Sequence, residues 1–388
     1  MRSSWIDSLT RRFRSTTSTE SPRGLSLEAA TLGLQAAPAP FAAEPWFLDH
    51  LNVEDNRVYV FGWSILTDNS TEPPGGWFLI NGKPFDELRY PFPRPDIGGV
   101  FWMHPGAELS GFEGAAEHLS EVYPDGILQV QRIRSNRRSI ESGRDFWCKP
   151  DPALHADIPD EAGRFRVIGD RDPHGFLLSG ATDYHRIDCT LFALSGRHLH
   201  EFANVLDWGV GCGRVARHFP SASAAALTGC DIDKQNVDWC SAHLRGDFVQ
   251  CTMHPPLPFA DGSFDVVYGI SVFTHLREAM QLRWLEELSR VLVHGGFVLV
   301  TIHGQTAIDF SREPREQFWR LTNSTRQQGI VVTKRNSQLD GHADHDGEYV
   351  DVLQTPEYVR RVWGRYFRVE HVLPGYILHH DLVILRKL

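Results

Sequence analysis

The chain has 388 residues, of which 41% are hydrophobic and 23% charged, and this composition predicts a soluble globular protein of about two domains. The formal net charge is −10, which argues against a nucleic acid or an anionic membrane as the main partner, because both bind basic surfaces. No apolar run is long enough to span a membrane. The six cysteines form no CxxC pair, so we expect reduced thiols and a cytoplasmic protein.

Residues 1–44 are rich in Ser, Thr, Arg, Ala and Pro and lack a sustained apolar period. Such a segment cannot bury enough apolar surface to offset the entropy cost of ordering it, so we predict a disordered tail. The five arginines of residues 1–24 are also compatible with an organellar transit peptide, whereas a secretory signal would need an apolar stretch that is missing here.

Residues 45–148 have the two-residue period of β-strands. Aromatic and β-branched runs lie at Val58–Trp63 and Trp77–Ile80. The second run is followed by Asn81-Gly82, a tight-turn dipeptide that tolerates positive φ. Residues Ile127–Ile133 alternate as a half-buried strand does. Several short strands with Gly- and Pro-rich connections predict a small sandwich or barrel.

Short motifs in this region, namely Gly62-Trp63, Asn81-Gly82, Arg94-Pro95-Asp96 and Gly111-Phe112, make it resemble the β-sandwich modules attached to bacterial enzymes that build surface polysaccharides. The resemblance implies that aromatic side chains stack on sugar rings, although aromatic residues more often fill a core. The candidates are Trp77, Tyr90, Phe92, Phe101 and Trp102.

A buried strand at Val205–Trp208 runs into a turn with glycines at 209, 211 and 213. Glycines at this spacing let the backbone turn sharply and approach a ligand closely. A dinucleotide fingerprint needs a glycine at position 214, where the chain has arginine, so a nicotinamide cofactor is disfavoured. The residues that follow, Val215–Phe219, are compatible with a helix.

A second strand, Ala224–Asp231, ends in an acid 18 residues after Gly213. An acid at the tip of the second strand can accept hydrogen bonds from both ribose hydroxyls in nucleoside-binding doubly wound folds. The alternative is that Asp231 caps the predicted helix Lys234–Leu244. The glycine turn at the appropriate distance favours ribose binding.

The remaining pattern alternates strands and helices. We predict strands at Phe248–Cys251, Val266–Ser271 and Phe297–Ile302, with a helix at Leu276–Leu292. Continuous apolar strands that alternate with helices predict a parallel sheet covered on both faces.

Over about residues 165–388 the chain resembles the class I S-adenosylmethionine-dependent methyltransferases. VLDWGVGCGR resembles their methionine-binding turn, Asp231 their ribose acid, and LPFADGSFDVVYGISVFTHL and ELSRVLVHGGFVLV their fourth- and fifth-strand motifs. The resemblance implies a Rossmann-like, doubly wound seven-stranded sheet whose last strands form a hairpin at Val369–Leu373 and Leu382–Leu385. It also implies S-adenosylmethionine as the cofactor. The implied cofactor-binding residues are Asp207, Gly209, Gly211, Gly213, Asp231, Ile232, Met253 and Ser271.

One feature departs from the family. Many members have an acid after the third strand that binds adenine, whereas this chain has Cys251-Thr252-Met253-His254. We therefore expect a hydroxyl, a backbone group or apolar contacts, for example from Ile232 and Met253, to hold the adenine. The segment Gly175–Gly180 and Tyr184 resembles the family's N-terminal segment that closes over the cofactor.

Transfer to an oxygen acceptor usually needs a base, and histidine has a suitable pKa near neutrality. His275 and His303 follow the fourth and fifth strands, whose carboxyl ends form the ligand crevice, so they are the catalytic candidates. We expect no metal site, because the cluster of His342 and His345 has the composition of a solvated loop. Residues 304–350 form an insertion too long for a simple connection, as expected for a lid or a substrate wall.

The sequence thus predicts four regions: a tail at 1–44, a β-rich accessory domain at 45–148, a linker with cofactor-capping helices at 149–203 and a methyltransferase domain at 204–388. The predicted activity is O-methylation of a small molecule or a glycan. The alternative is a catalytically silent methyltransferase fold whose β-rich module binds carbohydrate. The acceptor and the oligomeric state cannot be deduced from the sequence, because acceptor pockets are built from variable loops.

Overall fold

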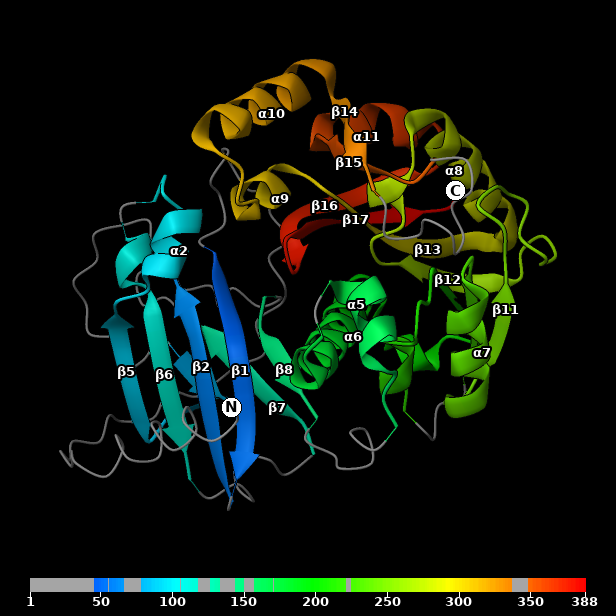
Figure 1. Ribbon diagram of the computed structural model, residues 1–388. Helices are drawn as coiled ribbons and strands as arrows, with labels where there is room; N and C mark the ends of the chain where they lie inside the picture. Colours follow the sequence, from blue (N-terminus) through cyan, green and yellow to red (C-terminus); the bar gives the residue numbers. More distant parts are fainter. Residues whose placement is uncertain are drawn as a thin grey trace.

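The computed structural model describes most of the chain from Pro45 to Leu388. The described ranges are 45–54, 56–65, 78–104, 106–117, 126–132, 144–149, 157–169, 171–220, 225–336 and 348–388. The predicted tail 1–44, Trp77 and the His342–Asp346 cluster lie outside them. A β-rich half and an α/β half lie side by side (Figure 1).

The β-rich half consists of two antiparallel four-stranded sheets. The first has the order β1 (Trp46–Glu54), β2 (Arg57–Ser64), β6 (Gly111–Ala116) and β5 (Glu87–Phe92). The second has the order β4 (Lys83–Pro84), β3 (Phe78–Ile80), β7 (Leu128–Arg132) and β8 (Phe146–Cys148). The short helices α2 (Pro95–Val100) and η3 (Ala107–Leu109) connect strands of the first sheet.

The core of this half lies between its two sheets. Phe112 of the first sheet stacks on Phe78 of the second with ring centroids 4.3 Å apart, and Trp46 meets Phe146 edge-on at 4.9 Å. Strand β7 alternates buried and half-buried residues, as its sequence predicts. Facing apolar surfaces of two sheets are the defining feature of a sandwich, so this half is a small all-β sandwich.

Among the described sugar-binding candidates, one aromatic residue is buried and two are half-buried against other rings. Phe101 is buried, Tyr90 contacts Phe78 with ring centroids 5.6 Å apart, and Phe92 contacts Phe61 at 5.8 Å. Half-buried Trp102 lines a surface hollow and carries the guanidinium of Arg315 over its ring at 4.4 Å. Sugar stacking therefore stays a prediction, and Trp102 is its best-placed candidate.

Helices α5 (Glu161–Ile168) and α6 (Pro173–Ser195) lie between the two halves (Figure 1). The hydroxyl of Thr182 on α6 bonds both the N–H and the carbonyl of Trp147. The buried guanidinium of Arg186 donates to the carbonyls of Asp145, Arg144 and, across the interface, Tyr376. Because buried carbonyls need donors, α6 joins the sandwich to the α/β half.

The α/β half contains one seven-stranded sheet of order β11-β10-β9-β12-β13-β17-β16. Its strands are β9 (Asn204–Trp208), β10 (Ala226–Asp231), β11 (Asp247–Gln250), β12 (Phe264–Gly269), β13 (Leu292–Ile302), β16 (Arg368–Ile377) and β17 (His380–Arg386). The first five strands are parallel and β17 is antiparallel to its neighbours. This is the predicted doubly wound, Rossmann-like sheet with a terminal hairpin.

Helices α7 (Lys234–His243) and α8 (Glu278–Val291) connect strands of this sheet. The predicted helix after the glycine turn is reduced to one 3-10 turn, η5 (Ala216–His218). The turn ends early because of Pro220, since a proline disfavours helical backbone in the residue before it. The chain therefore leaves the glycine turn without the long helix that the pattern favours.

The predicted insertion between the fifth strand and the terminal hairpin has its own secondary structure. It contains α9 (Gln305–Phe310), α10 (Arg315–Gln328) and β14 (Ile330–Arg335), and β14 pairs with β15 (Val350–Gln354). Helix α11 (Pro356–Val362) and the turn η7 (Trp363–Arg365) return the chain to β16. In the described ranges, no helix has the length and apolarity that crossing a membrane requires.

Candidate functional site

A cavity of about 390 Å³ lies at the carboxyl ends of the parallel strands. This is where open α/β sheets bind ligands, and the volume suits a small molecule. Its walls come from the end of α5, the turn after β9, the ends of β10, β12 and β13, and the tip of the β16–β17 hairpin. Tyr349 and Asn336 of the β14–β15 hairpin close one side.

The turn after β9 brings backbone close to this cavity. Gly209 and Gly211 line it, with φ values of 79° and 53° that side chains rarely adopt. A Cβ on Gly209 would lie 2.5 Å from Val272. Gly213 is not among the lining residues, and a Cβ there would lie 2.2 Å from Leu244. Two of the three predicted glycines therefore face the cavity, while the third makes room for packing.

Asp231 ends β10 with its carboxylate at the cavity wall. The N–H of Gly211 donates to Oδ2 and the N–H of Asp233 to Oδ1, each at 2.8 Å. Burial raises the pKa of Asp231 to about 6, although these two hydrogen bonds work in the opposite direction. The cap of α7 is Asp233, which accepts from the N–H of Gln235. Asp231 is therefore not the helix cap, and its oxygens keep lone pairs for a ligand.

The other predicted cofactor residues also line the cavity: Asp207, Ile232, Met253 and Ser271. Burial raises the pKa of Asp207 to about 7, and its Oδ2 accepts a hydrogen bond of 2.8 Å from the Tyr268 hydroxyl. Behind the turn, Arg214 pairs with buried Asp183 at 2.6 Å. The arginine that interrupts the dinucleotide fingerprint thus serves a buried ion pair.

The segment that covers the cavity differs from the predicted one. Residues 166–169, at the end of α5, line it, whereas residues 175–180 and Tyr184 do not. Tyr184 is buried in the core on one face of the sheet. Residues 166–169 fall within the region 149–203 that was predicted to hold cofactor-capping helices. Helix α5 itself was not singled out, because it is short and not strongly amphipathic.

His275 follows β12 in the turn η6 (Phe273–His275) and is buried. Its Nε2 lies 3.3 Å from the Ser271 hydroxyl. On the opposite side of the ring, Nδ1 lies 3.2 Å from Oδ1 of Asp351 and 3.2 Å from the carbonyl of Val350. Although burial opposes ionisation, hydrogen bonds from His275 and Asn336 lower the pKa of Asp351 to about 2. Asp351 is therefore an anion that fixes the His275 ring.

Ser271 and Tyr349 complete the surroundings of this ring. Tyr349 stacks on His275 with ring centroids 4.3 Å apart. Ser271 has φ 61°, and its N–H donates to the Thr301 hydroxyl at 2.7 Å. A non-glycine residue held at positive φ is strained, and such residues cluster at functional sites.

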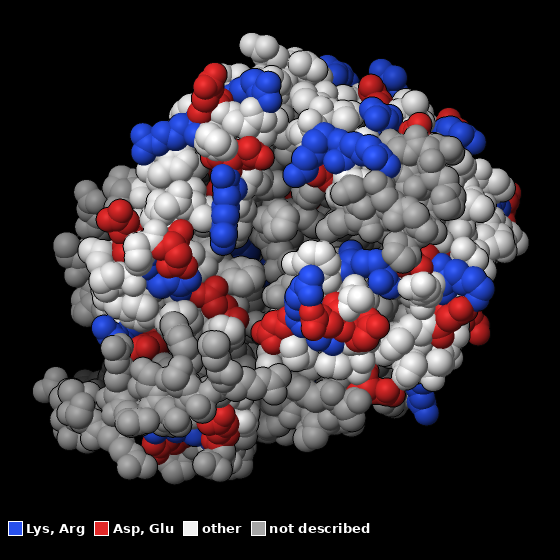
Figure 2. Space-filling model, viewed as in Figure 1, with Lys and Arg blue, Asp and Glu red and all other residues white. Residues whose placement is uncertain are grey.

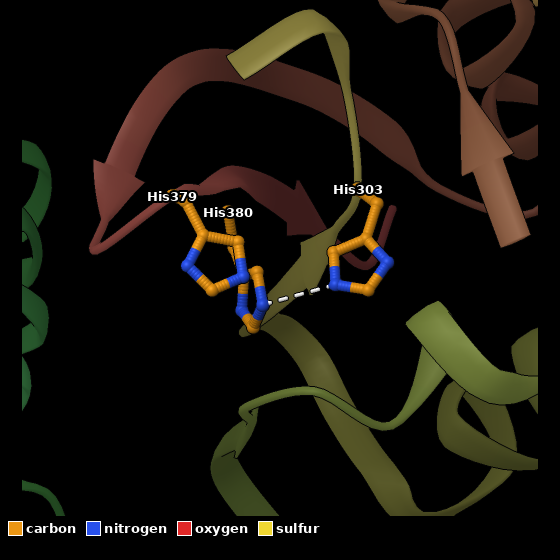
Figure 3. Close-up of side chains that lie close together, drawn as sticks. All are labelled: His303, His379 and His380. Carbon is orange, nitrogen blue, oxygen red and sulfur yellow. Dashed lines mark hydrogen bonds between the residues drawn. The ribbon is translucent and has the colours of Figure 1, made fainter. Parts of the chain in front are cut away.

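His303 follows β13 and lies beside two histidines that the sequence did not single out, His379 and His380 of the β16–β17 hairpin (Figure 3). Its Nε2 is 3.1 Å from Nε2 of His380. Burial lowers the pKa of His303 to about 3 and that of His379 to about 4, and it holds the pKa of His380 well below its usual value. The rings of His275 and His303 are 6.1 Å apart, so both predicted catalytic histidines face one cavity.

Comparison with known proteins gives this site a family. Residues 206–300 match the methyltransferase domain family, and this range includes the glycine turn, Asp231 and His275. The strand order found above is the one that the class I resemblance implies. The chain carries a class I S-adenosylmethionine-dependent methyltransferase domain.

Individual relatives of this methyltransferase domain are distant. A tRNA (carboxymethyluridine(34)-5-O)-methyltransferase of Arabidopsis thaliana is 34% identical over 99 residues, which are 25% of this chain and 23% of that protein. The chain thus spans about a quarter of the length of this curated relative. A SAM-dependent methyltransferase structure from Methanosarcina mazei is 16% identical over 50% of this chain and 96% of its own, with a TM-score of 0.37.

A similar solved structure is a Burkholderia thailandensis 1,6-didemethyltoxoflavin-N1-methyltransferase with bound S-adenosylhomocysteine. It is 16% identical over 64% of this chain and 98% of its own, with a TM-score of 0.35. Both TM-scores are low, so the family assignment depends on the matched residues and on the strand order.

The residues of the cavity fit the cofactor of this family, S-adenosylmethionine. The buried carboxylate of Asp231 faces the cavity with free lone pairs, which suits two ribose hydroxyls. Gly209 and Gly211 leave no side chain where a methionine moiety would approach the backbone. Ile232 and Met253 supply apolar contacts of the kind expected to replace the missing adenine acid.

Proposed function

We propose that this protein is an O-methyltransferase that uses S-adenosylmethionine to methylate a hydroxyl of a small molecule or glycan, with His275 as the general base. The observation that carries the proposal is the fixed orientation of His275 in the cavity. An anionic Asp351 lies on the Nδ1 side of its ring, and Nε2 lies on the side of Ser271, a residue of the cavity wall.

The neighbours of His275 determine where its proton lies. Both partners of Nδ1, the Asp351 carboxylate and the Val350 carbonyl, are acceptors, so Nδ1 carries the hydrogen in the neutral ring. Nε2 then has a lone pair directed towards the Ser271 hydroxyl, 3.3 Å away, and an acceptor hydroxyl has to replace Ser271 there before it can give up its proton. An imidazole held in one tautomer by a carboxylate is the arrangement that general-base catalysis requires.

When bound, S-adenosylmethionine supplies an electrophilic methyl group, and a C–O bond forms as its C–S bond breaks. The chain contributes orientation and a proton acceptor. Asp231 and the turn at Gly209 and Gly211 hold the cofactor at one end of the cavity. His275 takes the proton of the acceptor hydroxyl, and Asp351 stabilises the imidazolium that results.

His303 is a poorer candidate for this role. It lacks a carboxylate partner in the described structure, and its pKa of about 3 makes it a weak proton acceptor near neutrality. A general base works best when its pKa lies near the working pH. We assign proton transfer to His275, whose ring has the carboxylate partner that His303 lacks.

The surface favours a small or uncharged acceptor over a nucleic acid. The net charge is −10, and basic and acidic side chains are interspersed on the face that Figure 2 shows. Nucleic-acid binding depends on clustered Lys and Arg that neutralise phosphates. The tRNA named for the Arabidopsis relative is therefore not proposed as the acceptor here.

The test is methyl transfer from isotope-labelled S-adenosylmethionine to three fractions of a cell extract: small molecules, glycans and tRNA. We expect label in one of the first two, as a methyl ether identified by mass spectrometry and NMR, and a loss of that label in a His275→Gln variant. Label in tRNA would overturn the acceptor class. Binding of S-adenosylhomocysteine without any transfer would favour the catalytically silent alternative.

A further inference from the structure

We propose that His303, His379 and His380 form a binding site for one divalent transition-metal ion of the zinc class. One ring nitrogen of each residue lies within 4.8 Å of the others. The three rings come from two separate segments, the end of β13 and the tip of the β16–β17 hairpin, and converge on one place (Figure 3). We expected no metal site from the sequence, because His379 and His380 lie in a largely apolar hairpin and were not considered as ligands.

The spacing of the nitrogens suits a tetrahedral ion. Zn–N bonds of about 2.0–2.1 Å place two ligand nitrogens of a tetrahedral site about 3.3–3.4 Å apart. The Nε2 atoms of His303 and His380 are already 3.1 Å apart. The nitrogen of His379 lies within 4.8 Å of the other two, so it has to move by up to about 1.4 Å to reach the tetrahedral spacing. It lies half-exposed at the hairpin tip, where a ring can turn.

The hydrogen bonding of His380 also indicates a missing partner. This residue is buried, and its Nδ1 has no hydrogen-bond partner within the described part of the chain. Its Nε2 faces only another imidazole, that of His303. Buried polar atoms normally have partners, and the two Nε2 atoms meet in a single hydrogen bond, in which one ring donates and the other accepts. A cation between the two nitrogens would use a lone pair of each ring.

The backbone of the hairpin is strained next to these rings. The loop between β16 and β17 is Leu378-His379, and Leu378 has φ 54°. Two-residue hairpin loops strongly favour glycine or asparagine at such φ values. Strained residues of this kind cluster at ligand sites. The loop therefore retains unfavourable residues that place His379 and His380 in the cavity wall.

Three imidazoles that face a cavity define the kind of site. Imidazole suits zinc, copper, iron and nickel, and three protein ligands with an open position are typical of catalytic rather than structural zinc. All three histidines and His275 line the same cavity. An ion held by the three histidines would therefore lie in the same cavity as the ring that we assign as the base.

This position gives the ion a role that rests on the proposed function. A metal of this class polarises a bound hydroxyl and lowers its pKa strongly. An acceptor hydroxyl held beside His275 would lose its proton to Nε2 more easily. We therefore expect the acceptor to be an alcohol or phenol whose oxygen is a metal ligand. The metal site itself is testable without any acceptor.

The experiment uses the full-length, untagged protein, stripped with a chelator and then titrated with Zn²⁺ and Co²⁺. We expect one equivalent by elemental analysis, saturation at micromolar metal, and cobalt absorption bands of the intensity seen in four-coordinate sites. The variants His303→Asn and His379→Asn should each weaken binding by at least about 100-fold. The control His254→Asn removes an exposed histidine outside the cavity wall and should bind normally.

Several outcomes would overturn the proposal: no stoichiometric binding by the wild-type protein, binding that survives both variants, or an equal loss in His254→Asn. If either variant melts at a much lower temperature, X-ray absorption of the zinc-loaded wild type decides instead. Three imidazole ligands support the site, and fewer than three overturn it. Calorimetry with S-adenosylhomocysteine on the metal-free protein separates failure of this site from failure of the proposed function.

Discussion

The two ends of the cavity are built in different ways. The glycine turn and the ribose acid of the cofactor end come from one continuous strand–turn–strand segment, in which the N–H of Gly211 donates to Asp231 20 residues later. The acceptor end brings together residues far apart in the chain: His275 meets Val350 across 75 residues, and His303 meets His380 across 77. The difference shows how one scaffold keeps its cofactor while its acceptor chemistry changes.

The sharpest test of this division is His275→Ala. We expect turnover to fall by about 10²–10⁴-fold, the usual contribution of a general base, while affinity for S-adenosylhomocysteine stays within about twofold of the wild type. Single-turnover kinetics and calorimetry measure the two quantities separately. A variant that loses cofactor binding but keeps its maximal rate would place His275 at the cofactor end. His254→Ala is the matched control.

The complementary change at the cofactor end is Asp231→Ala. It removes charge-assisted acceptors for the ribose, so binding of S-adenosylhomocysteine should weaken by about 2–3 kcal/mol, which is about 30- to 150-fold. Asp233→Ala is the control, because it removes a neighbouring acid that caps α7 but does not line the cavity. Unchanged affinity in the Asp231 variant would overturn the ribose assignment.

The same division explains which parts of the site could be predicted from the sequence. The glycine turn, Asp231 and the strands around them are contiguous and periodic, so local pattern suffices. Tyr349 and Asp351 were missed because the β14–β15 hairpin has no signal that directs it towards His275. The doublet His379-His380 did carry a signal, since two adjacent histidines stand at the tip of a largely apolar hairpin, but nothing in sequence spacing connects it to His303.

The fold could be predicted because its strands and helices also follow local sequence patterns. The errors of that prediction concern single elements. The alternation of apolar strands and amphipathic helices indicated the parallel sheet, and the two-residue period indicated the sandwich. The residues after the glycine turn are compatible with a helix, but Pro220 limits them to the short turn Ala216–His218. The close association of α6 with both halves depends on Thr182 and Arg186, whose partners are backbone atoms that no side-chain pattern reveals.

A smaller effect is expected from Asp351→Asn. The amide keeps the size of the side chain but removes the anion that orients His275, while the Val350 carbonyl still accepts from Nδ1. Turnover should therefore fall by about tenfold, less than on loss of the base itself. Single-turnover kinetics of this variant beside the wild type and His275→Ala measures the fall. A loss as large as that of His275→Ala would mean that Asp351 has a further role.

The smallest expected effect concerns the cofactor end and its pH dependence. Burial raises the pKa of Asp231 to about 6, and ribose hydroxyls donate to the ionised carboxylate. The ionised form therefore binds the cofactor better, and affinity for S-adenosylhomocysteine should fall as the pH drops through 6. If only the ionised carboxylate of Asp231 binds the ribose, its protonation lowers the affinity for S-adenosylhomocysteine by about fourfold between pH 7 and pH 5.5.

The variant Asp231→Asn separates this titration from that of Asp207, whose pKa is raised to about 7 by burial and which lines the same cavity. The asparagine cannot ionise, so its affinity should lose the step near pH 6 and keep any step near pH 7. Calorimetry at half-unit intervals from pH 5 to pH 8 resolves the two. If the variant shows the same dependence near pH 6 as the wild type, another group titrates there, and the carboxylate of Asp231 does not hold the ribose. In that case the continuous segment from β9 to β10 would not be sufficient for cofactor binding, and the contrast between the two ends of the cavity would fail.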